Sequence, residues 1–179
     1  MSTPRFYLAL LSQAALLLFS ITVQATTVNL APGLEITLPS ALAIEIIEPQ
    51  DTSDHPILAG ELGGTPSYFI AATKVTMWER DPALWKRLES EIKKQNKTGE
   101  FLLRADDSFS ATPHDNVSFK AYEYESAEQK HIQVYFLLRD DRNIYWLTLT
   151  MAEGVDLDVV IPIAQMLISR AHFVDGFTL

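Results

Sequence analysis

The stretch of sequence that decides the fold is Val117 to Met151, VSFKAYEYESAEQKHIQVYFLLRDDRNIYWLTLTM. Apolar and polar residues alternate there in three runs, which are Val117–Glu125, His131–Arg139 and Ile144–Met151. Such alternation is typical of half-buried strands, and the short polar stretches between the runs are typical of hairpin connections. We therefore predict a three-stranded antiparallel meander.

The register of this meander can be derived from its side chains. If Arg139 lies opposite Ile144 and Glu125 lies opposite Lys130, nearly every aliphatic side chain falls on one face. A slip of one residue would move that set to the other face, so the register that buries the set is strongly preferred.

The opposite face of the meander is aromatic and polar. It carries Lys120, Tyr122, Tyr124, Gln133, Tyr135, Arg139 and Trp146. Tyrosine and tryptophan bury a large area and keep a polar group, which makes them frequent at protein interfaces. The alternative is structural: a helix could cover this face, with Trp85 and Leu88 packed on Trp146 and Leu137. Both interpretations stay open.

Working toward the N-terminus, apolar runs bounded by Pro and Gly predict further short strands. They are Val28–Leu30, Leu34–Leu38, Leu42–Glu48, Ile57–Leu62 and Ser67–Val75, with Gly63–Pro66 as a four-residue turn between the last two. A helix then follows, with Asp81 as its N-cap, Pro82 at its first position and Gly99 as its stop.

A last helix is predicted after the meander, from about Asp156 or Asp158 to Ala171. Pro162 lies inside this range, and proline removes one helical hydrogen bond. We therefore expect a short turn first, with the regular helix beginning near Pro162.

The N-terminus predicts export. Arg5 is followed by an apolar run from Phe6 to Phe19, and Val23 and Ala25 provide small residues at the positions that a signal peptidase reads. A retained membrane anchor is the competing interpretation, but a spanning helix needs about 20 predominantly apolar residues. Polar residues interrupt this run at Ser12, Gln13, Ser20 and Thr22. We therefore predict a signal peptide over residues 1–25, no stable membrane anchor after its cleavage, and one mature domain over residues 26–179.

Composition narrows the classes of function. The 179 residues include 14 Lys and Arg against 23 Asp and Glu, for a net charge of −9. A chain this acidic has no electrostatic footprint for nucleic acid or anionic lipid. It has no cysteine, which excludes disulfides, thiolate metal sites and cysteine nucleophiles. A cysteine-free exported domain suits the bacterial periplasm.

The order of these elements resembles the PsbP-like fold. Strands around Gly33-Leu-Glu-Ile-Thr-Leu-Pro39 open the chain, the meander ends in Ile144-Tyr-Trp-Leu-Thr-Leu-Thr150, and the last helix closes with Ser169-Arg-Ala-His-Phe173. The resemblance implies an α+β fold, an α/β/α sandwich around a central, mostly antiparallel sheet. It also implies a binding or assembly role without catalysis. No ligand residues of the family match position by position.

No catalytic or metal motif can be assembled from the residues. There is no Gly-x-Ser-x-Gly, and the four histidines lack His-x-x-x-His spacing, so we expect ordinary surface or helix-end histidines. Clustered carboxylates could suggest a calcium site, but none shows the spaced calcium-loop pattern, and turns and helix caps explain them better. These clusters are Asp106-Asp107, Asp140-Asp141 and Glu153/Asp156/Asp158. We predict no enzyme activity, no cofactor and no metal.

The sequence therefore predicts a non-enzymatic protein-binding or assembly factor of the bacterial envelope, located in the periplasm. Contacts to a protein partner are expected at residues left exposed around the meander edge or ahead of the first helix. These are Tyr122, Tyr124 and Arg139, with Trp78 and Arg80 as the second group. Three alternatives stay open: an immunity-type inhibitor of an exported toxin, a binder of a small apolar ligand, and a hydrolase using Asp106, Asp140 or Glu153.

Overall fold

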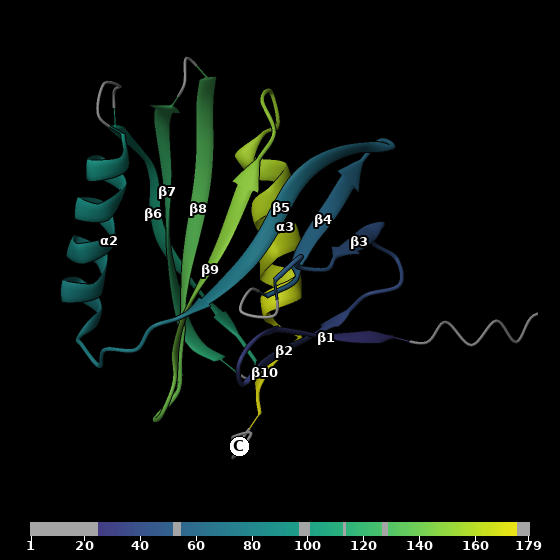
Figure 1. Ribbon diagram of the computed structural model, residues 1–179, viewed down its shortest axis with the longest axis horizontal. Helices are drawn as coiled ribbons and strands as arrows, with labels where there is room; N and C mark the ends of the chain where they lie inside the picture. The colour runs from purple at the N-terminus through teal and green to yellow at the C-terminus, as the bar shows by residue number, and fades with distance from the viewer. Residues whose placement is uncertain (1–24, 52–54, 97–100, 113, 127–128, 175–179) are drawn as a thin grey trace, which may run out of the picture.

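The predicted meander forms the middle of the main sheet in the computed structural model of the chain (Figure 1). Its strands are β7 (His114–Ser126), β8 (Gln129–Arg139) and β9 (Ile144–Met151). Glu125 lies opposite Lys130, and Arg139 lies opposite Ile144, so the derived register is confirmed.

The structure describes residues 25–51, 55–96, 101–112, 114–126 and 129–174. The predicted signal peptide lies outside the described residues, except for Ala25, and so does the predicted helix stop at Gly99. None of the helices in the described residues is long and apolar enough to span a membrane.

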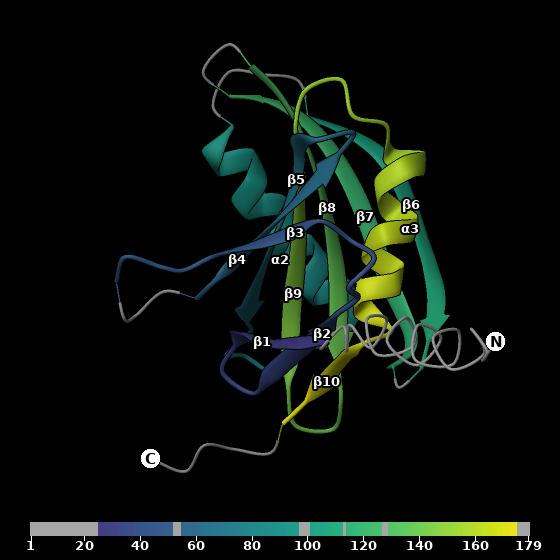
Figure 2. The ribbon, with the colours of Figure 1, turned by 90° about the vertical axis from the view of Figure 1, so that its right-hand side faces the viewer.

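The main sheet has seven antiparallel strands in the order β3-β4-β5-β9-β8-β7-β6, and a second sheet has the order β1-β2-β10. The remaining strands are β1 (Thr26–Ala31), β2 (Leu34–Leu38), β3 (Ile44–Ile47), β4 (Ile57–Leu62), β5 (Thr65–Lys74), β6 (Phe101–Ala111) and β10 (Ala171–Phe173). Helix α2 (Asp81–Gln95) and helix α3 (Leu157–Ile168) lie on opposite sides of the main sheet (Figure 2). The predicted fold class is confirmed.

The two sides of the main sheet hold separate cores. One core joins the sheet to α3 and the small sheet, and its buried side chains are almost entirely aliphatic or phenylalanine. The other joins the sheet to α2 through Leu84, Trp85, Leu88 and Ile92. We call these two sides of the main sheet the α3 side and the α2 side.

The β4–β5 hairpin is tighter than predicted. Its connection is the two-residue turn Gly63-Gly64, and Thr65 already pairs with Leu62. Both glycines have positive φ, +61° and +79°, as a two-residue turn between twisted strands requires.

Both helix starts differ from the prediction. In α2, Arg80 occupies the N-cap position without a side-chain cap, and Asp81 is the first helical residue. In α3, the Asp156 side chain accepts a hydrogen bond from the Asp158 backbone, and the helix runs unbroken through Pro162. The expectation that the regular helix begins near Pro162 is wrong, because this cap starts the helix earlier.

The end of the chain also differs. Helix α3 stops at Ile168 rather than at Ala171, because Ala171 pairs with Ile36 and residues 171–173 join the small sheet. Strand β6 is a further addition, which the sequence analysis does not predict.

Candidate binding surface

Helix α2 covers the aromatic face of the meander. The rings of Trp85 and Trp146 meet edge to face at 4.6 Å between centroids, and Leu88 and Leu137 are buried in the same cluster. The structural alternative of the sequence analysis therefore describes this face. Tyr122 is only 1% exposed beneath the helix, so its predicted role as an accessible contact is wrong.

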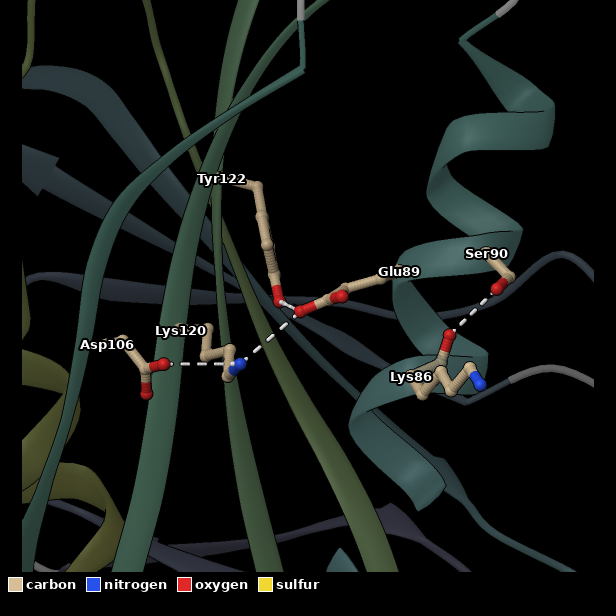
Figure 3. Close-up of polar contacts among 6 residues, drawn as sticks. All are labelled: Lys86, Glu89, Ser90, Asp106, Lys120 and Tyr122. Carbon is tan, nitrogen blue, oxygen red and sulfur yellow. Dashed lines mark hydrogen bonds and ion pairs between the residues drawn. The ribbon is translucent and has the colours of Figure 1, made fainter. Parts of the chain in front are cut away.

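A polar network ties α2 to the sheet (Figure 3). The Tyr122 hydroxyl donates a hydrogen bond to Glu89 Oε1 at 2.8 Å, and Lys120 Nζ lies 3.3 Å from the same oxygen. Lys120 Nζ also lies 3.2 Å from Asp106 Oδ2 and 5.4 Å from the Trp85 ring centroid. Burial, followed by the bond to Glu89, raises the pKa of Tyr122. The network therefore positions the helix on the sheet.

Glu89, Lys120 and Asp106 of this network line an open groove of about 410 Å³ between α2 and strands β6 and β7. Two carboxylates, Glu89 and Asp106, face each other across it. A glycosidase-like pair of carboxylates must flank the bond that is cleaved. Here the Lys120 ammonium occupies the space between them and is ion-paired to both. This pair therefore lacks the open gap that a carboxylate-dependent hydrolase needs.

Tyr124 is half-buried at the far end of β7. Its ring lies 5.8 Å from the His131 ring across the β7–β8 pair, and burial raises the pKa of its hydroxyl. Tyr124 is therefore separated from the residues that precede α2, and a binding role for it stays a prediction.

The predicted residues Trp78 and Arg139 are brought together by the fold. Trp78 lies in the loop between β5 and α2 and is 57% exposed, and Met77 beside it is 56% exposed. The Arg139 guanidinium lies over the Trp78 ring, 5.1 Å from its centroid, and is ion-paired to Asp81. We call Met77, Trp78 and Arg139 the Trp78 corner.

Further contacts hold the corner in place. Arg87 of α2 reaches back to the loop, where Nη1 lies 3.3 Å from Met77 Sδ and 3.0 Å from Glu79 Oε1. Arg80 is exposed at the start of the helix. The exposed apolar side chains of the corner are therefore held by two arginines that are themselves ion-paired.

Sequence reasoning missed one residue of the corner, Met77, and one residue that anchors it, Asp81. It gave no role to Met77, and it took Asp81 for a helix cap, whereas the Asp81 carboxylate binds Arg139. A usable signal was present for Met77: the pair Met77-Trp78 precedes the helix and does not belong to its apolar stripe.

Two of the three acidic clusters serve a turn and a cap, as predicted, but Asp106 and Asp107 lie within strand β6, where Asp106 is ion-paired to Lys120, so the prediction is wrong for this pair. Asp140 Oδ1 accepts hydrogen bonds from the backbone N–H groups of Arg142 and Asn143 at 2.7 and 2.6 Å, which closes the β8–β9 turn. Asp156 caps α3. Over the residues described, no group of three or more metal-ligating side chains comes together.

One histidine differs from the expectation of surface positions. His114 is 5% exposed, and its Nε2 lies 2.8 Å from the carbonyl oxygen of Ala171. A carbonyl only accepts, so Nε2 carries the proton and donates. Burial lowers the pKa of His114.

No family model matches the chain, and no curated protein matches it. Among solved structures, it is similar to the solution structure of cyanobacterial PsbP (CyanoP) from Synechocystis sp. PCC 6803. The two are 9% identical with a TM-score of 0.51, over 79% of this chain and 87% of that chain. It is also similar to LpqN, described as involved in cell envelope biogenesis of Mycobacterium tuberculosis. Those two are 13% identical with a TM-score of 0.50, over 84% of this chain and 91% of that chain. The chain thus has the PsbP-like fold.

Proposed function

We propose that this chain is an exported, non-enzymatic binding protein of the bacterial envelope that holds a protein partner through the Trp78 corner. The observation that carries the proposal is the exposure of Met77 and Trp78 in a loop that two arginines hold in place. Aromatic residues, methionine and arginine are the types enriched at the centre of protein interfaces. Side chains that are already ordered lose less conformational entropy on binding.

Two further observations support export and an envelope role. The first strand begins at Thr26, immediately after the predicted cleavage point at Ala25. One protein of similar fold, LpqN, is described as involved in cell envelope biogenesis. The finer assignment is therefore an accessory factor for an envelope assembly.

The net charge of −9 favours a second candidate, an immunity-type inhibitor of a basic exported toxin. Opposite charges steer two proteins together, and this steering weakens as salt is added. A toxin partner should therefore bind much more slowly at high salt, whereas a partner held mainly by Met77 and Trp78 should not.

The test is affinity capture from an envelope extract with immobilised residues 26–179. We expect Trp78→Ala to lose any specific partner, because an aromatic hot-spot residue typically contributes about 2 kcal/mol or more. The matched control is Leu103→Ala on β6, which removes an apolar side chain that is 45% exposed. Recovery of the same proteins by wild type, control and Trp78→Ala would reject the corner as the binding surface.

A further inference from the structure

Helix α2 covers only part of the sheet face on which it packs. Its core takes sheet side chains from β7, β8 and β9 and, among the described residues, none from β3, β4 or β5. Figure 1 shows α2 beside β6 and β7, with β3 and β4 at the opposite edge of the sheet. This edge of the α2 side therefore has no helical cover in the described part of the chain.

The strand register identifies the side chains on this uncovered area. Trp146 of β9 packs against Trp85 of α2, and Thr73 of β5 lies directly opposite Trp146. Directly paired residues share a face, and so do residues two apart on one strand. Ala71 and Phe69 of β5 therefore also point to the α2 side.

The same reasoning extends to the edge of the sheet. Phe69 lies opposite Ala59 of β4, and Ile57, two residues from Ala59, lies opposite Ile47 of β3. We call the five residues Ile47, Ile57, Ala59, Phe69 and Ala71 the open face. Ile47, Ile57 and Phe69 are 41%, 37% and 36% exposed, which is high for side chains of this size.

The position of the open face and its pattern of large and small side chains suit the packing of a helix. Strands lie about 4.8 Å apart, and packed helices lie about 8–10 Å apart. Helix α2 packs on β7, β8 and β9, so a helix beside it would lie over the next strands of the sheet, β5 and β4. Small and large side chains alternate there: Ala59 lies opposite Phe69, Ala71 is two residues from Phe69 on β5, and Ile57 is two residues from Ala59 on β4.

The charges around the open face define the chemistry of the occupant. One cavity of about 250 Å³ is lined by Glu45 and Glu61 beside Ala59. A second, of about 350 Å³, is lined by Glu48 with Ile47 and Ile57. Among the described residues that line these two cavities, there are three glutamates and no lysine or arginine.

We propose that the open face docks an amphipathic α-helix of a partner protein, one whose apolar stripe is flanked by lysine or arginine. The stripe would lie over Ala59 and Ala71, and the cations would reach Glu45, Glu48 and Glu61. Helix-in-groove binding of this kind is a recurring mode of recognition. The surface shares no residue with the Trp78 corner, so it adds a contact beyond the proposed function.

The test uses a defined probe, an 18-residue leucine/lysine peptide with leucine at helical spacing. The matched control peptide has the same leucines, with glutamate at every lysine. Titration of residues 26–179 is followed by amide NMR shifts and calorimetry. We expect the lysine peptide to bind and to shift amides of β3, β4 and β5, and the glutamate peptide not to bind.

Two variants locate the site. Phe69→Ser should lower the affinity for the lysine peptide by about tenfold, since it removes the largest apolar side chain of the open face. The double variant Glu45→Gln/Glu61→Gln changes only exposed side chains. This double variant should lower the affinity for the lysine peptide several-fold and reduce the salt dependence of that affinity. Leu103→Ser, at an apolar position on β6 that is 45% exposed, should bind the peptide like wild type.

Several outcomes would overturn the proposal. They are no binding of the lysine peptide, equal binding of both peptides, or shifts that map outside β3–β5. Self-association that Phe69→Ser abolishes would assign the open face to a second copy of the chain instead. Trp78→Ala should bind the peptide normally, so failure of this proposal and failure of the Trp78 corner are distinguishable.

Discussion

The α3 side and the α2 side of the main sheet differ in the size of their cores and in what covers them. In the described residues, the core of the α3 side has 26 buried residues, and the core of the α2 side has eight. The α3 side is closed over by a helix and a second sheet. Over the same described residues, the α2 side has one helix, a polar network around Glu89 and Lys120, and an edge without helical cover.

We expect this difference to separate stability from the proposed recognition. Buried apolar area supplies most of the folding free energy, so the larger core should dominate it. The α2 side should contribute less to stability, and it presents four exposed apolar residues, Ile57, Phe69, Met77 and Trp78. Unfolding measurements on the two sides can confirm or break this division.

The largest effect is expected on the α3 side, at Phe136. This side chain is fully buried, and its ring lies 5.5 Å from the ring of Phe119 and 6.2 Å from that of Phe109. Phe136→Ala should lower the free energy of unfolding by about 3–5 kcal/mol, through lost transfer energy and the cavity left behind. Urea titration followed by circular dichroism measures it. A loss under 1.5 kcal/mol would mean that this side does not dominate.

Close packing of the α3 side gives the second prediction, at Gly60. A Cβ built on Gly60 would lie 1.9 Å from the nearest atom of the Tyr68 ring, which is 1% exposed. Gly60→Ala should therefore cost about 2–3 kcal/mol, as overpacking does. In the background of Tyr68→Val the same substitution should cost much less, because the ring is gone. Equal costs in both backgrounds would show that the ring is not the cause.

On the α2 side, we expect a substitution at Tyr122 to cause a smaller loss of folding stability. Tyr122→Phe removes only the hydroxyl that donates to Glu89, whose side chain is 31% exposed. We expect a loss of about 1 kcal/mol, the ordinary net value of one hydrogen bond. Urea titration followed by circular dichroism measures the loss. A loss of about 3 kcal/mol or more, as large as that expected at Phe136, would contradict the division into two sides.

The sequence alone was sufficient for the meander, and the resemblance of its element order to the PsbP-like fold supplied the fold class. One register places the aliphatic side chains of 117–151 on one face, so local alternation carries long-range information there. Strand β6 lacks that signal. Asp106 and Asp107 interrupt its alternation, because β6 is an edge strand whose Asp106 lies opposite Lys120 and is ion-paired to it.

The site was harder to predict, because it depends on which elements meet in space. Tyr122 and Tyr135 share a pattern with Tyr124, yet α2 buries the first two and leaves the third half-exposed. The contact between Trp78 and Arg139 joins residues far apart in the chain. Sequence could nominate both residues as exposed anchors but could not place one above the other.

The free energy of unfolding should also depend on pH, through His114 on the α3 side. His114 is neutral in the fold, and burial holds its pKa below the ordinary value of about 6.5. The unfolded chain then binds a proton that the folded chain does not, so stability is complete above pH 6.5 and falls as the pH drops toward the folded pKa. Urea titrations from pH 8 to pH 5.5 should show this decrease in wild type.

The matched variants are His114→Gln and His131→Gln. The first should flatten the decrease over this pH range, and the second should keep it. The Glu123 carboxyl does not interfere, because its hydrogen bond from Arg104 lowers its pKa further below this range. An unchanged slope in His114→Gln would assign the pH effect to another group.

The smallest change in the free energy of unfolding is expected at Trp78, whose side chain is largely exposed on the α2 side. Its only described ring partner is the Arg139 guanidinium, and an exposed cation–π contact contributes about 0.5–1 kcal/mol at most. Burial of a 57% exposed ring adds little, so Trp78→Ala should change the free energy of unfolding by about 0.5 kcal/mol or less.

Trp85→Ala, with its ring 7% exposed on the same side, should cost several times more. This result would identify Trp78 as a large apolar side chain that folding does not need, and it would support the proposed binding role. If Trp78→Ala instead cost as much as Trp85→Ala, Trp78 would belong to the core of the α2 side, and the proposed binding surface would lose its main support.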